Sequence, residues 1–372
     1  MKYLLFVILC VPFLLTAQAP ETVKRYNDAV KAAKKKDHES AVKIYSEVVE
    51  MDPSYFKAYL NMGTSYMRLK DYESALATYD KCLKLEPENG KVHYLAGQCS
   101  MKMEKNGDAI ESFTSALNYN PKLTKTYYYR AKIQMDNKSY DKAITDFQDA
   151  ITKDKASEKT YYYLGVCYLR KKNQDSLARE SFKLALGQKE DYIPALTEIT
   201  KLAYKQDDFS AAIEMANRLQ AADPNNPKAP YYRAMSLMKT DQLAPAYASF
   251  DELLVIEKNN KYALANKASI SLKQKNYKAA VGDYNILIAK HPKKKHYYNR
   301  ALSQMQLEAW QLALNDLNEV IDQDEKYAEA YFNRSNVQLQ LGYKDKACSD
   351  MQQAAKLGYT KANDYLLSTC GS

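Results

Sequence analysis

The sequence predicts an all-α protein built from about ten copies of one 34-residue repeat. The first observation is that one scheme of aromatic and small residues, clearest in residues 59–87, returns 34 residues later from His93 and again from Tyr127. The second is composition, because ten Gly and eleven Pro in 372 residues are few for a turn-rich β fold. The third is that no linker or low-complexity tract interrupts the repeats, so we expect one continuous array.

The repeated scheme places small residues at fixed positions. In the second repeat Gly63, Ala75 and Cys82 occupy positions 8, 20 and 27. This period and these positions resemble the tetratricopeptide-repeat (TPR) family over nearly the whole chain after the N-terminal segment. The resemblance implies a right-handed α-solenoid of about ten helix-turn-helix units with a C-terminal capping helix. It also implies a binding role, without naming the partner.

Taken in order, the repeats are expected to begin at Thr22, Phe56, Gly90, Thr124, Glu158, Ile193, Pro227, Lys261, Lys294 and Ala328. Repeat 5 holds one extra residue near Gln174, and repeat 9 starts one residue early. Repeat 1 has Asp28 at an apolar position of its first helix, as expected of a polar terminal cap. Residues 361–369 are expected to form one more helix over the open end. The chain therefore divides into residues 1–19, the array of residues 20–361, and a capping helix and tail of residues 362–372.

A correlation between two positions supports this register. Position 7 is basic in five repeats, as Arg130, Arg233, Lys267, Arg300 and Arg334. Position 23 of those repeats is Asp146, Ser249, Asp283, Asp316 and Asp350, so four of the five carry an acid, and no other repeat does. We expect an ion pair between the two helices of one repeat, and interpret these basic residues as structural.

Residues 1–19 have the pattern of a secretory signal peptide. Lys2 precedes an apolar run too short for a transmembrane helix, which needs roughly 20 residues. Cleavage after Ala17 is favoured over cleavage after Ala19, because Pro20 would follow the second site. Lipidation of Cys10 is not expected, and a retained membrane anchor is the alternative. No second long apolar segment follows, so we expect no stable membrane insertion after signal removal.

The remaining cysteines suggest one disulfide and leave a second open. Cys348 and Cys370 are symmetric about the turn before the capping helix, which predicts a disulfide between them. Such a disulfide would stabilise the folded protein by roughly 3 kcal/mol. Cys82 and Cys99 are symmetric about the turn near residue 90, and could equally be two buried thiols in contact. Cys167 is expected to be a core thiol.

The sequence offers no catalytic or cofactor motif. The four His residues lack metal-site spacing, and no HExxH, GxSxG, Walker or GxGxxG motif occurs. We therefore expect no enzyme activity, no cofactor and no metal site.

In the TPR family, positions 2, 5, 9, 12 and 13 of the first helix line the concave face. Here these positions give a Tyr and Met floor between Lys-rich rows, and the positive charge fades toward the C-terminus. The predicted groove residues are Lys57, Lys91, Tyr94, Met101, Lys102, Lys125, Tyr128, Lys159, Tyr162 and Arg170. The alternative is that the lysines are merely solvated and the tyrosines pack on the neighbouring repeat.

The groove and the net charge of +9 favour an extended, acidic or C-terminal-carboxylate-bearing polypeptide as partner. The family's carboxylate clamp of Lys and Asn is not met, because Leu95 and Tyr129 replace its Asn in repeats 3 and 4. In repeats 8 to 10 Asn266, Asn299 and Asn333 align, but no Lys precedes them. Because the chain is expected to be exported, nucleic acid is not expected as its partner.

The sequence thus predicts an exported scaffold or adaptor that assembles a cell-envelope complex. The periplasm is the expected location, with secretion or outer-membrane association as alternatives. The competing function is a structural or self-associating module that binds anionic surface polymer. The oligomeric state stays open.

Overall fold

The computed structural model describes residues 19–153 and 157–370, and these residues are all-α, with 21 α-helices, one π-helical turn and no strand. They form two compact units, one through Ala185 and one from Leu186, and the boundary falls within one helix. The predicted signal peptide, apart from Ala19, lies outside the described residues. The single continuous array stays a prediction.

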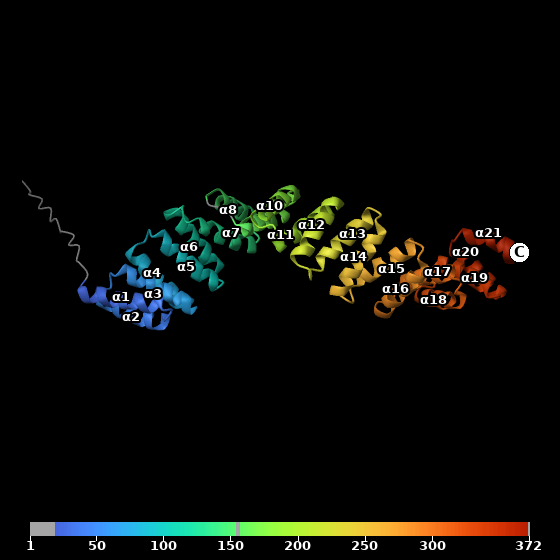
Figure 1. Cartoon of the computed structure of the whole chain (residues 1–372), viewed down its shortest axis with the longest axis horizontal. Helices are drawn as coiled ribbons and strands as arrows, with labels where there is room; N and C mark the ends of the chain where they lie inside the picture. The colour runs from blue at the N-terminus through green and yellow to red at the C-terminus, as the bar shows by residue number, and fades with distance from the viewer. Residues whose placement is uncertain (1–18, 154–156, 371–372) are drawn as a thin grey trace, which may run out of the picture. The chain divides into compact units, whose positions relative to one another are not determined.

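Figure 1 shows the helices following one another as pairs within each compact unit. The N-terminal unit contains α1 (Pro20–Lys34), α2 (His38–Met51), α3 (Phe56–Leu69), α4 (Tyr72–Leu85), α5 (Gly90–Lys102), α6 (Asn106–Tyr119), α7 (Thr124–Asp136), α8 (Tyr140–Lys153) and α9 (Glu158–Leu169), and α10 (Asp175–Gln188) carries the boundary. The C-terminal unit contains α11 (Ile193–Lys205), α12 (Phe209–Ala222), α13 (Lys228–Lys239), α14 (Leu243–Ile256), α15 (Lys261–Lys273), α16 (Tyr277–Lys290), α17 (Lys294–Gln306), α18 (Trp310–Gln323), α19 (Ala328–Gln340), α20 (Lys344–Lys356), α21 (Lys361–Tyr365) and the π-helical turn η1 (Leu366–Cys370).

The helix-turn-helix repeat is confirmed. From α1 to α9, and again from α11 to α21, each helix packs on the next helix in the chain. The first helices of repeats 2 to 10 begin at the predicted residue, except α13, which begins one residue late at Lys228. The predicted capping segment is present as α21 and η1. Its Ala362 is buried, and the rings of Tyr359 and Tyr365 contact Phe332.

The core is built where the two helices of a repeat approach most closely. In several repeats the small residue at position 8 of the first helix faces a buried aromatic ring on the second helix. A Cβ placed on Gly97 would lie 2.7 Å from the Phe113 ring, and one on Gly63 would lie 2.6 Å from the Tyr79 ring. Both rings are fully buried. Glycine is therefore required at these positions unless the paired ring moves.

The basic residue at position 7 joins three helices, and the predicted ion pairs are confirmed. Arg334 donates to both Asp350 oxygens at 2.7 and 2.8 Å, and Arg130 and Arg300 bind Asp146 and Asp316 in the same two-bonded way. The lysine at this position, Lys267, lies 3.3 Å from Asp283.

The third helix in this arrangement was not predicted. Each position-7 residue also bonds a polar side chain at position 25 of the preceding repeat. Arg334 donates to Asn318 at 2.8 Å, and Lys267 contacts Asp251 at 2.7 Å. The further partners are Thr114 for Arg130, Asn217 for Arg233 and Asn285 for Arg300. The cation therefore joins successive repeats as well as the two helices of its own repeat.

Cys348 and Cys370 form a disulfide, with their Cα atoms 5.7 Å apart, so this predicted bond is present. It ties η1 to α20 at the C-terminal end. Cys82 and Cys99 are free and buried, so the second bond that the sequence left open is absent. The sulfur of Cys99 instead lies 3.0 Å from the sulfur of Met67 on the neighbouring first helix. Cys167 is a buried free thiol, as expected.

The turn inside each repeat uses a residue with positive φ. Gly fills this place in repeat 10, as Gly342 with φ of 79°. In the other repeats it is a residue with a side chain, namely Lys36, Lys70, Glu104, Lys138, Asn173, Asp207, Asp241, Lys275 and Glu308. Left-handed backbone costs such residues roughly 1–2 kcal/mol, so these turns are held by the packing of the helices on each side.

We expect Glu104→Gly to stabilise the protein by about 0.5 kcal/mol, because relief of the strained turn exceeds the added freedom of the unfolded chain. Gly342→Ala should cost about 1 kcal/mol for the opposite reason. Urea unfolding followed by circular dichroism measures both. Gly282→Ala is the control, since Gly282 lies in the middle of α16 with open space around it, and Ala should stabilise there. Equal signs for the two Gly→Ala changes would contradict this account.

We expect Asp146→Ala to destabilise the protein by about 3 kcal/mol, because it leaves the mostly buried Arg130 cation without its carboxylate. Ser249→Ala removes a neutral partner of Arg233 at the same position and should cost only about 1 kcal/mol. The double change Arg130→Met with Asp146→Leu should recover most of the loss. Thermal unfolding compares the three variants, and equal losses for the two single changes would show that the buried charge is unimportant.

Candidate binding surface

Four predicted lysines begin four successive first helices. Lys57, Lys91, Lys125 and Lys159 are each the second residue of α3, α5, α7 and α9. All four side chains are exposed, and none forms an ion pair with a described residue. A cation in the first turn of a helix opposes the helix dipole. The structure therefore leaves a row of positive charge without an internal partner.

The predicted tyrosines lie three residues further along these helices, on the same side as the lysines. Tyr94, Tyr128 and Tyr162 are half-buried. Gln98 donates a hydrogen bond of 2.9 Å to the Tyr94 hydroxyl, and burial raises the pKa of Tyr94 to about 12. The three rings are thus partly packed and partly open, which combines the two interpretations of the sequence.

Two tyrosines that the sequence analysis did not select connect this group. Tyr129 and Tyr163 follow the predicted tyrosines at position 6. The Tyr129 ring lies 6.1 Å from Tyr94 of the preceding repeat, and the Tyr163 ring lies 6.2 Å from Tyr128. The Lys132 ammonium lies 4.6 Å from the centre of the Tyr163 ring. The doublets Tyr128–Tyr129 and Tyr162–Tyr163 were the available signal.

The rings form one connected series through repeats 3 to 5. Each link is a ring contact of 5.2 to 6.2 Å between centroids, and it runs through Tyr94, Phe113, Tyr129, Tyr128, Phe147, Tyr163, Tyr162 and Phe182. We call these eight residues the aromatic series. Because the buried phenylalanines hold the tyrosines from below, the exposed parts of the tyrosines have restricted motion.

The remaining predicted residues lie at the other end of the same helices. Met101 is half-buried and packs against the apolar cluster of Ala109, Phe113 and Ile133. Lys102 at the end of α5 and Arg170 just after α9 are exposed and form no ion pair with a described residue. The surface formed by α3, α5, α7 and α9 therefore has basic residues at both helix ends and the tyrosines of the aromatic series between them. We call it the first-helix surface.

In the C-terminal unit position 2 is lysine in two of five repeats, as Lys228 and Lys295, and some lysines at other positions are paired. Lys273 and Lys294 there pair with Asp241 and Asp324 at 2.6 and 2.5 Å. The asparagines that align in repeats 8 to 10 are also engaged. Asn333 donates to the Tyr298 hydroxyl at 2.8 Å, and Asn299 donates to the Tyr284 hydroxyl at 2.9 Å. These asparagines hold neighbouring helices together.

Among residues 19–153 and 157–370, no group of three His, Cys, Asp or Glu side chains is arranged to hold a metal ion. Over the same residues, no helix has the length and apolar character needed to cross a membrane.

Models of the tetratricopeptide repeat match residues 56–89, 94–159 and 328–357. These parts of the chain are tetratricopeptide repeats. The repeats of this chain resemble a segment of serine/threonine-protein phosphatase 5. The rat protein (Rattus norvegicus) is 31% identical over 102 residues, which are 27% of this chain and 20% of the phosphatase. The human protein is 30% identical over 95 residues, 25% of this chain and 19% of the phosphatase. This chain thus spans about a fifth of those relatives.

Several solved structures are similar over part of the chain. A crystal structure of MamA is 25% identical, covers 46% of this chain and 94% of MamA, and has a TM-score of 0.44. A tetratricopeptide repeat protein from Parabacteroides merdae is 21% identical over 67% of this chain and 99% of its own, with a TM-score of 0.42. The C-terminal part of a repeat protein from Cytophaga hutchinsonii is 20% identical, covers 73% and 99%, and has a TM-score of 0.47.

Proposed function

We propose that this protein binds an extended, acidic polypeptide along the first-helix surface, and that it acts as a scaffold or adaptor by binding rather than by catalysis. Tetratricopeptide repeats typically bind protein partners, which supports the general role. The observation that carries the specific proposal is the row of four exposed lysines without internal acidic partners, beside the aromatic series.

The lysine row supports an acidic partner. Each ammonium lies at the N-terminal end of its helix, where the dipole makes a cation unfavourable by roughly 0.3–1 kcal/mol. A carboxylate of a ligand placed there would be attracted by both the lysine and the helix end. Because the lysines recur once per repeat, from Lys57 to Lys159, an extended chain carrying acids along its length matches them better than a single anion does.

The aromatic series supports a polypeptide over a simple polyanion. Tyrosine side chains supply large contact area at a small entropic cost, and aromatic anchors dominate many protein interfaces. Tyr94, Tyr128 and Tyr162 are half-buried, so each can contact a ligand without first leaving the core. A ligand that carried only acidic groups would contact the lysines and leave the tyrosines without a partner.

We further propose that the chain is exported, with the periplasm as its location and the assembly of a cell-envelope complex as its role. The signal-peptide pattern of residues 1–19 supports this, and so does the disulfide between Cys348 and Cys370, since such bonds persist in oxidising compartments. N-terminal sequencing of protein purified from its native source tests export. A first residue of Gln18 or Pro20 is expected, and a retained Met1 would contradict it.

The binding proposal is tested with a fluorescent 16-residue peptide of alternating Glu and Tyr, followed by anisotropy. We expect Lys57, Lys91, Lys125 and Lys159 changed together to Glu to weaken binding at least 30-fold at low salt. Each lost charge contact near the surface contributes on the order of 0.5 kcal/mol, and each introduced acid adds repulsion. The same peptide with Gln in place of Glu should bind the unchanged protein weakly.

The control variant has the same change in net charge, but on second helices. In it Glu replaces four exposed lysines, Lys81, Lys84, Lys142 and Lys183. It should bind the peptide nearly as well as the unchanged protein. Equal weakening in both variants would indicate a non-specific charge effect. Unaltered binding in the first variant, with a molar mass that grows with concentration in light scattering, would favour the self-associating module instead.

A further inference from the structure

The positive charge of the chain is concentrated in repeat 8 and the loop that follows it. Residues 258–295 contain ten lysines, no arginine and one acid, Asp283, which is an excess equal to the net charge of +9 of the whole chain. Three of these lysines, Lys267, Lys273 and Lys294, have acidic partners within the protein. The other seven form no ion pair with a described residue.

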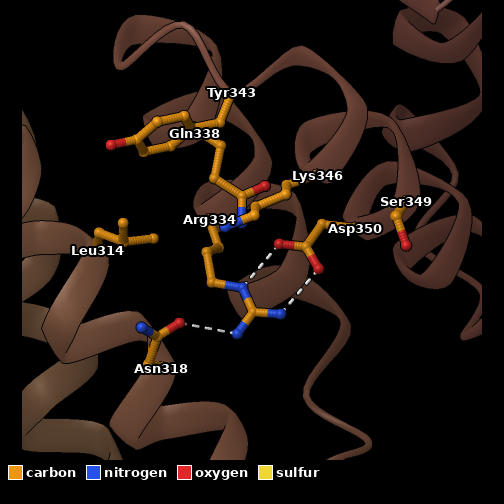
Figure 2. A pocket seen from close by; sticks show the side chains of 8 residues that line it. All are labelled: Leu314, Asn318, Arg334, Gln338, Tyr343, Lys346, Ser349 and Asp350. Atoms are coloured by element: carbon orange, nitrogen blue, oxygen red, sulfur yellow. Dashed lines mark hydrogen bonds and ion pairs between the residues drawn. The ribbon is translucent and has the colours of Figure 1, made fainter.

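Cations at the contacts between helices of the same unit are satisfied within the protein. Figure 2 shows the Arg334 guanidinium held between Asp350 and Asn318. Its bonds to the two Asp350 oxygens and to the Asn318 oxygen are 2.7 to 2.8 Å long. The seven unpaired lysines of residues 258–295 have no such structural role, so their charge is directed to the surroundings of the protein.

Five of the seven lie in or beside two loops that connect successive repeats. Lys258 and Lys261 belong to the loop between α14 and α15 and to the first turn after it, and Lys290, Lys293 and Lys295 surround the loop between α16 and α17. All five are exposed. Because the two helices of a repeat are antiparallel, the loops between repeats lie at one edge of the unit, and the turns inside repeats lie at the opposite edge.

Packing brings these two loops together. Leu254 near the end of α14 and Tyr297 near the start of α17 both pack against one buried cluster, which includes Leu287 and Ile288 near the end of α16. The two loops are therefore anchored to the same cluster, and the five lysines around them belong to one region of the surface.

Exposed apolar side chains lie in the same region. Val255 and Ile286 are chain neighbours of residues that pack in this cluster, but their own side chains face outward and are 80% and 52% exposed. Tyr262 is 57% exposed, and its ring centre lies 5.0 Å from the Lys261 ammonium. Single exposed apolar side chains are ordinary, but three of them among unpaired lysines have the composition of a surface that contacts a membrane. We call Val255, Tyr262, Ile286 and the five lysines the loop-edge patch.

We propose that the loop-edge patch binds the surface of an anionic lipid bilayer. The five ammonium groups meet the lipid phosphates, and each lysine near such a surface strengthens binding roughly fivefold. Val255 and Ile286 enter the layer below the head groups, where aliphatic side chains are removed from water. Tyr262 has the amphipathic ring that is enriched at this depth. The protein in this arrangement lies on the bilayer and does not cross it.

The apolar residues favour a bilayer over a soluble polyanion. A phosphate polymer or a nucleic acid contacts the lysines and leaves Val255 and Ile286 in water. An anionic bilayer is the partner that takes both kinds of side chain at once, since its charged surface lies directly above an apolar layer.

Flotation with vesicles tests the proposal. It uses the chain from Pro20 onward, which contains every described helix and lacks the apolar segment before it. One set of vesicles is phosphatidylcholine with about a third phosphatidylglycerol, and the other is phosphatidylcholine alone. We expect binding to the anionic vesicles at physiological salt, and at least tenfold weaker binding to the neutral ones. Changing Lys290, Lys293 and Lys295 together to Gln should weaken binding to the anionic vesicles at least 20-fold.

The matched control for charge changes Lys239, Lys275 and Lys278 together to Gln. These lysines are exposed, form no ion pair with a described residue, and lie at or beside the turns inside repeats 7 and 8, at the opposite edge. This variant should bind the anionic vesicles within about twofold of the unchanged protein.

A second pair of variants separates lipid from polyanion. Val255→Ser with Ile286→Ser should weaken vesicle binding at least fivefold, and should leave the binding of soluble polyphosphate, followed by calorimetry, unchanged. Its control is Leu307→Ser with Leu312→Ser, since these side chains are 46% and 55% exposed at the turn inside repeat 9. The control should bind vesicles like the unchanged protein. All the changed side chains are exposed, so the melting temperatures should agree closely.

Absence of flotation with the anionic vesicles would overturn the proposal, as would equal losses in the first lysine variant and its control. If the lysine variant lost binding while the variant of Val255 and Ile286 kept it, the patch would bind polyanions and not a bilayer. A molar mass that grows with concentration and falls in the lysine variant, without flotation, would make a second copy of the chain the partner. No residue of the first-helix surface belongs to the patch, so this experiment and the peptide experiment can fail separately.

Discussion

The structure depends on the close approach of two helices within each repeat. A single pair of helices has an apolar side that it cannot bury alone, so each repeat must pack on its neighbour. The approach is possible because a residue as small as Gly97 faces a ring as large as Phe113, with no room for another carbon atom. This contact sets the register of the pair, and the register then decides which residues of the first helix remain exposed. The first-helix surface is a consequence of that packing.

The sequence predicted the helix pairs and the ion pairs well, because both repeat with a fixed period inside one chain. Arg130 and Asp146 recur as Arg300 and Asp316, so their partnership was visible without other sequences. The third contact was not visible. Its residue belongs to the preceding repeat and varies in type, for example Thr114 in one repeat, since any polar oxygen at that point satisfies the cation.

Packing between repeats explains what the sequence missed at the candidate site. The sequence analysis took one repeat position at a time and so separated Tyr128 from Tyr129. The Tyr129 ring contacts Tyr128 in its own repeat and Tyr94 in the preceding repeat. The symmetric spacing of Cys82 and Cys99 correctly placed them on facing helices, but spacing does not choose a side-chain neighbour. Cys99 meets Met67 instead. Both cases depend on side-chain direction at a contact between repeats, which periodicity alone does not specify.

The two compact units differ in how regularly lysine occurs at position 2 of the first helices, and this difference is the argument for where binding occurs. In the C-terminal unit only Lys228 and Lys295 stand at position 2, in repeats that are not adjacent, and two lysines at other positions, Lys273 and Lys294, have acidic partners. In the N-terminal unit the position-2 lysines, Lys57 to Lys159, have none, and nothing needs to be displaced. A row of unpaired cations at helix N-termini is a cost to the isolated protein that a fitting ligand removes.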